Sequence, residues 1–425
     1  MAIMEAYVRH GSFVESLGAP RVFAHDIGTL RGFGDILHQV PGIRKYDRTT
    51  AIARPDDVVF LKSAPDKTYL QWLGEVGLGS KNIVVINGRE DVSLPERIMK
   101  NGGKNTLDQL LGDSRNGAVF SPYYGGRLER RTSDYLGLFM YSHTELAEEL
   151  DNKIGFKLTC KKLGIPVVKE SIIDTYMTES EMARVIQQRL EKTGKVILRG
   201  EYGASASTIH VLNHVDTSFL QGLRKRYPTR DRFLVEPFFE TRSSPSSVWF
   251  IKRDGSIIHL RTSNQILENG ISHLGNEFPV QFDEGFVDRM SFRFAQYLAK
   301  KGFIGPFGLD YIETEKGIFA TECNPRMTGA IYPWELVYLL EQKGSVRAAR
   351  SENIKLPHGC REFKVLKQLW NDVLYDGKSS EGVVIPYNVG PIRTGKVTVL
   401  CTGDSTESVM GLLSYIKSKL ESIEM

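Results

Sequence analysis

Three oxygen-bearing side chains near residue 320 are spaced so that they could hold a metal ion. Glu322 and Asn324 are two positions apart in ATECNPR, and Asp310 ends the apolar stretch IGPFGLD. Residues i and i+2 of a strand face the same side, and a hairpin that turns near Lys316 brings Asp310 opposite them. Two carboxylates and an amide oxygen are hard ligands that suit Mg²⁺. We therefore predict that Asp310, Glu322 and Asn324 bind Mg²⁺, with Mn²⁺ as an alternative.

Arg326 follows this set by two residues. Its guanidinium could hold a phosphoryl group or a developing oxyanion there. The alternatives are a solvated acidic hairpin with an Asn-Pro turn and, for Arg326 itself, an ion pair with a surface carboxylate such as Glu335. The flanking stretches FGLDYI and GIFATE are apolar, which places the carboxylates inside a sheet, where unpaired charges are costly. The pattern favours a functional site.

Two further segments could bind a nucleotide. The expected strand at 195–200 carries Arg199 and runs into a small-residue loop, GASAS, from Gly203 through Ser205 to residue 207. Backbone N–H groups and hydroxyls of such a loop are donors for phosphate oxygens. Small-residue turns are common, however, and this one is neither a Walker loop nor a G-x-G-x-x-G fingerprint. The segment LVEPFFE (234–240) offers the apolar walls of a purine slot, with a buried core strand as its alternative.

The first 150 residues alternate short apolar runs with helical patterns. DDVVFLKS (56–63) and KNIVVING (81–88) are apolar, β-branched and closed by turn residues, which is typical of buried parallel strands. PDKTYLQWLGEVG between them predicts the crossover helix of a βαβ unit. LERRTSDYLGLFMYSHTELAEELDNK is predicted to be mostly helical. We expect a small α/β domain in this region.

From Asp151 the pattern changes to a helix followed by hairpins. NKIGFKLTCKKLG predicts an amphipathic helix that ends at Gly164 and Pro166. SVWFIKRDGSIIHLRTS predicts a hairpin that turns at Asp254-Gly255, and FGLDYIETEKGIFATECNP predicts a second one. The tail contains a strand, GKVTVLCTG, and an amphipathic helix, SVMGLLSYIKSKL. The expected division of the chain is residues 1–150, residues 151–350 and residues 351–425.

The composition excludes several classes of protein. The chain has 425 residues, 41% hydrophobic and 25% charged, with a net charge of +4, so neither nucleic acid nor an anionic membrane is an expected partner. The four cysteines lack the spacing of a zinc site and fit a reducing compartment. The N-terminus has no apolar h-region, and no run of about 18 apolar residues occurs. We expect a cytoplasmic location; the oligomeric state is not predicted.

The order of the motifs resembles the ATP-grasp superfamily. DNKIGFKLTCKKLGIPV, ILRGEYGASAS, LVEPFFE, GFIGPFGLDYI and ATECNPRMTG follow one another between about residues 151 and 345. TSNQILENGISHLGNEFP and the tail GVVIPYNVGPIRTGKVTVLCTG resemble the carboxylate–amine ligases of bacterial peptide natural products. The resemblance implies an α/β protein with a pre-ATP-grasp domain, a two-lobed ATP-grasp domain that binds ATP and Mg²⁺, and a small C-terminal α/β piece.

The resemblance also implies a role for each site residue. Lys153 matches the nucleotide lysine of the first helix, Arg199 stands where a second phosphate-binding lysine is usual, and Glu236 matches the acidic hinge residue beside adenine. The remaining matches are Gly203 and Ser205 in the phosphate loop, Asp310, Glu322 and Asn324 as metal ligands, and Arg326 as the catalytic arginine. Arginine for lysine at 199 keeps the charge but changes the geometry. The usual ribose-binding glutamate is not evident, and Glu240 is a substitute candidate.

The implied reaction is an ADP-forming ligation. A carboxylate becomes an acyl phosphate, which an amine or a thiol attacks. Within this group the chain resembles the butirosin-type glutamate–[acyl-carrier protein] ligases of antibiotic biosynthesis, and the resemblance implies L-glutamate as substrate and an acyl carrier protein as partner. A free peptide or dipeptide ligase is an equal alternative. A carboxylase of the same superfamily shares Glu-x-Asn-Pro-Arg, and a catalytically inactive nucleotide-binding scaffold is the alternative from another class.

Overall fold

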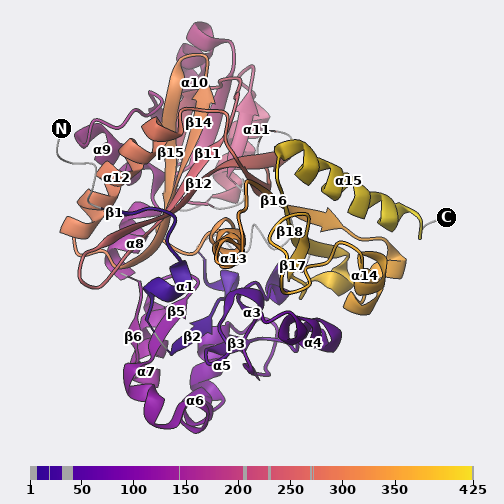
Figure 1. Ribbon diagram of the computed structural model, residues 1–425. Coiled ribbons are helices and arrows are strands. Elements are labelled where there is room, and N and C mark those ends of the chain that lie inside the picture. Colours follow the sequence, from indigo (N-terminus) through magenta and orange to yellow (C-terminus); the bar gives the residue numbers. More distant parts are fainter. Residues whose placement is uncertain are drawn as a thin grey trace.

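The computed structural model describes residues 7–18, 20–30, 42–142, 144–203, 208–227, 231–268, 270 and 272–423. Within these residues the strands form three sheets: an N-terminal parallel sheet, a small antiparallel sheet and a long mixed sheet that reaches the C-terminal part (Figure 1). The predicted α/β class is therefore confirmed. No helix within these ranges combines the length and the apolar composition that crossing a bilayer requires.

The N-terminal sheet is parallel, as its apolar, β-branched runs predict. Its order is β4 (Asn82–Val85), β3 (Val58–Leu61), β2 (Arg21–Ala24), β5 (Val119–Pro122) and β6 (Phe139–Met140). Its helices include α3 (Thr49–Ile52), α4 (Lys67–Glu75), α5 (Leu94–Lys100), α6 (Gly103–Leu111), α7 (Arg127–Leu136) and α8 (Thr144–Leu150). The predicted βαβ unit is β3–α4–β4. The short β6 interrupts the stretch that was expected to be mostly helical.

The small antiparallel sheet forms one lobe of the next region. Its order is β7 (Ser171–Asp174), β10 (Arg232–Pro237), β8 (Val196–Gly200) and β9 (Ile209–Leu212). Two helices, α10 (Glu179–Thr193) and α11 (Thr217–Arg226), pack with it, and their apolar faces share a core with Ile173, Leu198 and Phe233. The phosphate loop follows β8, and the predicted purine segment begins in β10, so the two candidate nucleotide elements start from neighbouring strands.

The long sheet carries both predicted hairpins. Its order is β15 (Gly317–Asn324), β14 (Gly305–Thr314), β11 (Pro245–Ile251), β12 (Ile257–Glu268), β13 (Ser272–Phe278), β16 (Ala348–Lys355), β18 (Lys396–Gly403) and β17 (Val384–Asn388). The β11–β12 pair turns around Asp254 and Gly255, and β14–β15 turns around Lys316, as the sequence predicts. Helix α9 (Lys153–Lys162) packs against β15, and α12 (Glu284–Lys300) packs against β11 and β12.

Both ends of the chain join this sheet. Strand β1 (Tyr7–Val8) pairs in parallel with β12, and β16 pairs with β13, so the C-terminal strands extend the same sheet. The expected boundary at residue 350 lies within β16. The tail also contains the helices α14 (Phe363–Leu369) and α15 (Thr406–Glu421). Helix α15 packs on β16 and β18.

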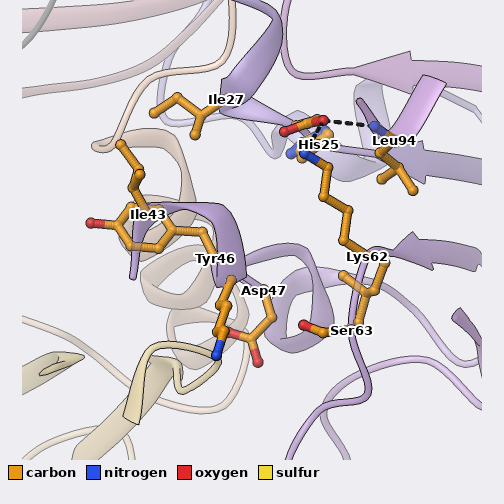
Figure 2. A pocket seen from close by; sticks show the side chains of 11 residues that line it. His25, Ile27, Ile43, Tyr46, Asp47, Lys62, Ser63 and Leu94 are labelled. Atoms are coloured by element: carbon orange, nitrogen blue, oxygen red, sulfur yellow. Dashed lines mark hydrogen bonds and ion pairs between the residues drawn. The ribbon is translucent and has the colours of Figure 1, made fainter. Parts of the chain in front are cut away.

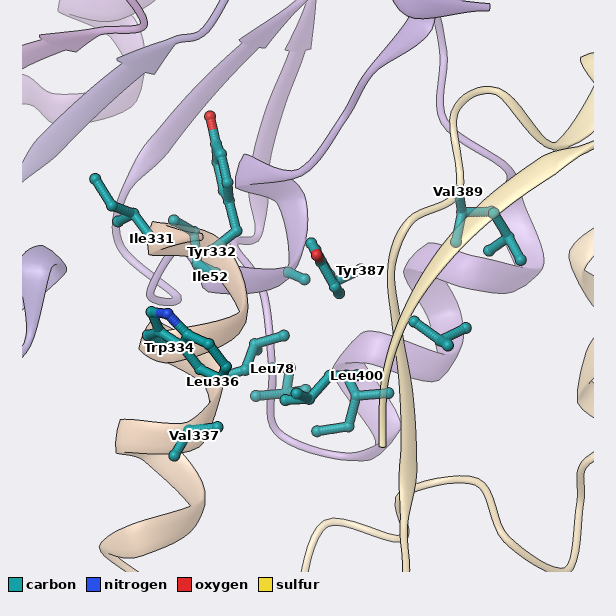
Figure 3. Packing of buried hydrophobic residues seen from close by; sticks show 14 of the residues in the cluster. Ile52, Leu78, Ile331, Tyr332, Trp334, Leu336, Val337, Tyr387, Val389 and Leu400 are labelled. Carbon is teal, nitrogen blue, oxygen red and sulfur yellow. The ribbon is translucent and has the colours of Figure 1, made fainter. Parts of the chain in front are cut away.

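Helix α13 (Ile331–Glu341), which follows the candidate site, lies at the centre of a core shared by the N-terminal and C-terminal parts (Figure 3). Its Tyr332 and Trp334 are buried in one cluster with Ile52 and Leu78 of the N-terminal part and Leu400 of β18. Burial of such large apolar side chains is the main favourable contribution to packing. The three parts of the chain are thus fixed around the segment that carries Arg326.

Candidate active site

The β14–β15 hairpin places the three predicted metal ligands together. Asp310 and Glu322 are direct cross-strand partners, and Asn324 stands two residues beyond Glu322 on the same strand. The Asn324 Nδ2 atom lies 2.8 Å from Asp310 Oδ2 and 3.4 Å from Glu322 Oε1. On the other side of β14, Ser246 pairs directly with Asp310 and hydrogen-bonds its carboxyl group. Spacing along the sequence predicted the first three residues but not Ser246.

The two carboxylates disfavour each other's ionisation. Burial and the charge of Glu322 raise the pKa of Asp310 to about 7. Burial alone would raise the pKa of Glu322 as well, but Lys153, Arg199 and other cations lower it. Such a pair of hard oxygen donors fits a divalent cation, which would allow both groups to be ionised. The NH₂ group of Asn324 points toward the carboxylates. The side-chain amide would have to rotate by about half a turn for its oxygen to face a metal ion.

Arg326 is fixed beside the metal set. Its Nη2 atom donates to Asn324 Oδ1 at 2.5 Å, and its backbone N–H donates to the Asn324 carbonyl at 2.8 Å. Its Nε atom is buried and has no hydrogen-bond partner among the described residues. The alternative of a surface ion pair with Glu335 is wrong, because Glu335 is buried and pairs with Arg54 at 2.5 Å and with Ser12 at 2.7 Å. The guanidinium therefore keeps donors for a ligand.

Lys153 connects the phosphate loop to the metal set. It opens helix α9, whose N-cap Asn152 accepts from two backbone N–H groups of the first turn. The buried Lys153 Nζ lies 3.1 Å from Glu322 Oε2 and donates to the Gly203 carbonyl at 3.0 Å. Gly203 has φ +136°, a conformation that favours glycine. Ser205 lies outside the described residues, so its expected phosphate contact is not placed.

Arg199 and Glu236 form a buried ion cluster. Arg199 Nε donates to Glu236 Oε2 at 2.7 Å, and its Nη2 donates to the Thr321 carbonyl at 3.2 Å. Lys157, which the sequence analysis did not single out, contacts the other Glu236 oxygen. Burial opposes ionisation of Glu236, but the two cations outweigh it and hold its pKa below the usual range. Glu236 therefore positions two cations, and a contact of its carboxylate with adenine stays a prediction.

The sequence did contain a signal for Lys157. It lies four residues after Lys153, and both are on the buried side of α9, where two lysines need anionic partners. Glu240 lies beyond the end of β10 and is exposed, so its ribose contact also stays a prediction. Phe239, which precedes Glu240, stacks on Phe319 of the β14–β15 hairpin with ring centroids 6.3 Å apart.

A cavity of about 650 Å³ opens beside the metal set. This volume is within the range of small-molecule sites. Asp310, Glu322, Asn324 and Arg326 line one part of it. Residues from the N-terminal, central and C-terminal parts of the chain line the rest, including Tyr46, Arg48, Tyr123, His273, Arg361 and Lys396. Sequence reasoning missed this second group, because its members come together only in the folded chain.

A much smaller cavity of about 20 Å³ adjoins it at the carboxyl ends of β2 and β3 (Figure 2). Both cavities share Ile27, Ile43 and Tyr46 as walls. Lys62 Nζ lies 2.6 Å from Asp26 Oδ2, and the backbone N–H of Leu94 donates to the same oxygen at 2.7 Å. The space suffices for about one water molecule, so of these two cavities the larger one can hold a substrate.

A family model described as the ATP-grasp domain matches residues 157–330. The chain therefore contains an ATP-grasp domain between residues 157 and 330. It is an ATP-grasp enzyme of the ADP-forming ligase type. The match begins at Lys157 in α9 and ends at Ala330, just before α13, and so includes both candidate nucleotide segments and the metal hairpin. No curated protein sequence matches the chain.

Solved structures share the ATP-grasp architecture over most of the chain. An N5-carboxyaminoimidazole ribonucleotide synthetase in complex with ADP has a TM-score of 0.56 and 12% identity, covering 94% of this chain and 97% of that one. The enzyme of that type from Staphylococcus aureus has a TM-score of 0.52 and 12% identity, with 98% and 100% covered. The biotin carboxylase domain of 2-oxoglutarate carboxylase from Hydrogenobacter thermophilus, in complex with MgADP and bicarbonate, has a TM-score of 0.52 and 14% identity, with 80% and 75% covered. At these identities the likeness establishes the fold.

Proposed function

We propose that this ATP-grasp ligase activates an amino-acid carboxylate as an acyl phosphate and passes the acyl group to an amine or a thiol. The observation that carries this proposal is the hairpin. It puts two carboxylates, an amide and Arg326 on the wall of a cavity that can hold a second substrate. Phosphoryl transfer to a carboxylate requires alignment and charge neutralisation more than acid–base groups, and this wall supplies both.

Each side chain of the site would have one task. Asp310, Glu322 and Asn324 would hold Mg²⁺, which neutralises phosphate charge when it is bound. Lys153, Arg199 and the loop with Gly203 and Ser205 would bind the phosphates, and Glu236 and Glu240 would lie near adenine and ribose. Arg326 would stabilise the charge on the phosphoryl group during transfer, because its buried Nε has no hydrogen-bond partner among the described residues. The substrate carboxylate would be the nucleophile toward phosphorus.

We further propose L-glutamate as the carboxylate donor and a carrier-protein thiol, or an amine tethered to the carrier, as the acceptor, in antibiotic biosynthesis. The support is the resemblance of 262–279 and of the tail to ligases of peptide natural products. A free dipeptide ligase would use the same activation step with a free amine. Both reactions end in ADP and phosphate, so they differ only in the acceptor.

A second candidate is carboxylation, with bicarbonate as the activated carboxylate. The specific observation in its favour is the likeness of the whole chain to synthetases of N5-carboxyaminoimidazole ribonucleotide and to a domain whose structure contains bicarbonate. The chemistry at phosphorus is the same for bicarbonate and for an amino acid. The substrates therefore have to be distinguished by assay.

The test is ADP release from MgATP against a panel of amino acids, with and without a holo carrier protein, and against bicarbonate. We expect release that depends on one amino acid and increases with the carrier protein or a second amino acid. Release that depends on bicarbonate alone would replace the first candidate by the second. Absence of release with every member of the panel, despite bound MgATP, would indicate an inactive nucleotide-binding protein.

A further inference from the structure

Besides the residues of the hairpin, the large cavity is lined by cations that surround Tyr46. The Arg48 guanidinium carbon lies 4.6 Å from the centre of the Tyr46 ring, and Lys396 Nζ lies 5.2 Å from it. Lys396 Nζ also donates to the Tyr46 hydroxyl at 2.7 Å. Figure 2 shows Tyr46 next to Ile43. Two cations from distant parts of the sequence thus share one aromatic ring.

Arg361 adds a third cation next to Lys396. A Cβ atom built on Gly395 would lie 2.3 Å from Arg361 Nη1, so the guanidinium lies directly against that glycine. Gly395 has φ +84°, which also favours glycine at this position. Arg361 donates to the Arg393 carbonyl at 3.3 Å, which fixes the direction of its side chain. All three cations line the same cavity.

These cations lack a carboxylate partner among the described residues. The Nε atoms of Arg48 and Arg361 are buried with no hydrogen-bond acceptor in that part of the chain. The nearby Asp47 belongs to the small cavity, and its Oδ1 accepts from the Val389 backbone N–H at 2.9 Å. Burial, and next the charge of Arg48, lower the pKa of Lys396 to about 8. Like charges are thus held together at a cost that an anion would relieve.

We propose that Arg48, Arg361 and Lys396 bind an anionic group, a carboxylate or a phosphate, of the amine or thiol substrate. This inference rests on the proposed function, since it needs the acyl phosphate to form at the hairpin. Guanidinium groups bind both kinds of anion with paired hydrogen bonds. Holding a remote anion orients the nucleophile and excludes molecules without that charge. The acceptor class is therefore an amine or thiol that carries a carboxylate or a phosphate, whether it is free or attached to a carrier protein.

The test is calorimetric titration of the full chain, saturated with Mg²⁺ and a non-hydrolysable ATP analogue, with glutarate and with inorganic phosphate. The analogue occupies the nucleotide site, so that Arg326 and Lys153 do not bind the added anion. The variants are Arg361→Gln and Lys396→Gln, with Arg361→Lys as a variant that keeps the charge. Arg393→Gln is the matched control, because it removes an exposed positive charge two residues from Gly395.

We expect one of the two anions to bind the wild type, which also identifies the class as carboxylate or phosphate. Arg361→Gln and Lys396→Gln should weaken it about 10-fold or more, as loss of a charge-assisted hydrogen bond does, while the control changes little. Affinity for the ATP analogue should be unchanged in all variants. The proposal would be overturned if neither anion binds the wild type, or if both Gln variants bind the anion as tightly as the wild type does. If the analogue itself fails to bind, the proposed function fails, and titration of the nucleotide-free protein still tests the anion site.

Discussion

Asp310 and Glu322 are partners across the β14–β15 hairpin, and they differ in their neighbours: Glu322 has a lysine beside it. Lys153 lies 3.1 Å from Glu322, whereas Asp310 has neutral partners, Ser246 and Asn324, and the more distant charge of Arg326. The pair is thus suited to a bound divalent cation, which would compensate both charges. Because the two carboxylates have different neighbours, substitutions of single residues can test their roles separately.

We expect Glu322→Gln and Asn324→Ala each to abolish MgATP turnover while the fold survives. Each substitution removes one oxygen ligand, and Mg²⁺ tolerates little loss of ligand geometry. The measurement is ADP release as a function of Mg²⁺ concentration, with circular dichroism as the check on folding. Glu315→Gln, an exposed acid at the tip of the same hairpin, is the control and should keep wild-type turnover. Wild-type rates in both site variants would contradict the metal assignment.

Arg326→Ala should preserve ATP affinity and lower the turnover rate by a factor of about 10² or more, judged by the removal of comparable electrostatic donors. The physical reason is that charge on the transferring group is greatest in the transition state. Arg326→Lys should rescue activity only in part, since an ammonium cannot replace a planar fork. Steady-state kinetics, with affinity measured separately by calorimetry, decides this. A near-normal rate for Arg326→Ala, with the exposed Arg289→Ala as reference, would exclude a catalytic role.

Lys153→Ala and Arg199→Ala should both raise the ATP requirement, and the second should destabilise the fold more than the first. Each loses a charged phosphate contact of about 1.5–3 kcal/mol. Arg199→Ala in addition leaves the buried Glu236 with Lys157 as its remaining cation, and breaking a buried pair costs about 3 kcal/mol or more. Calorimetry with ATP and thermal unfolding separate the two effects. Equal melting temperatures for both variants would count against the ion cluster, and Lys162→Ala on the same helix is the control.

At the scale of helices and strands, the sequence predicted the elements wherever local patterns determine them. Both hairpins turn where Asp254-Gly255 and Lys316 indicate, because turn residues and alternating apolar positions act within a few residues. The two-residue β6 was missed, since so short a strand carries no periodic signal. The pairing of β16 with β13 was also missed, because register between distant strands depends on the whole fold.

The candidate site was likewise predicted only where its residues are close together in the sequence. Spacing predicted Asp310, Glu322 and Asn324, whose neighbours along the strands fix their positions. Arg48, Arg361 and Lys396 could not be predicted in this way, since several hundred residues separate the first from the other two and no spacing along the sequence relates them. Only the shared core around α13 brings their segments together (Figure 3).

At the scale of the whole molecule, Asp47 connects the N-terminal and C-terminal parts, and its titration should affect stability. Burial raises the pKa of Asp47 from 3.8 to about 7, so the folded protein binds this proton more tightly than the unfolded chain. Its contribution to stability is therefore present below about pH 4 and is lost as the pH rises toward 7. Asp47→Asn keeps an oxygen acceptor for the Val389 N–H and removes the titration.

We expect the free energy of unfolding to fall less between pH 5 and pH 8 in Asp47→Asn than in the wild type. The difference should be about 1 kcal/mol or more, since a tenfold change in a proton's dissociation constant corresponds to about 1.4 kcal/mol. Urea unfolding at several pH values measures it. Asp56→Asn, an exposed neighbour in the sequence, is the control. Parallel pH profiles for Asp47→Asn and the wild type would show that the buried carboxyl group does not govern this dependence.

The most direct test of carboxylate activation is transfer of ¹⁸O from the substrate carboxylate to phosphate. Amino acids and bicarbonate labelled in the carboxylate oxygens are incubated with the protein, MgATP and acceptor, and the released phosphate is analysed by mass spectrometry. An acyl phosphate predicts that, with the true substrate, the phosphate released with ADP contains one ¹⁸O atom, because the attacking carboxylate oxygen stays on phosphorus. ADP released with unlabelled phosphate for every substrate that stimulates it, or formation of AMP and pyrophosphate, would contradict the proposed activation.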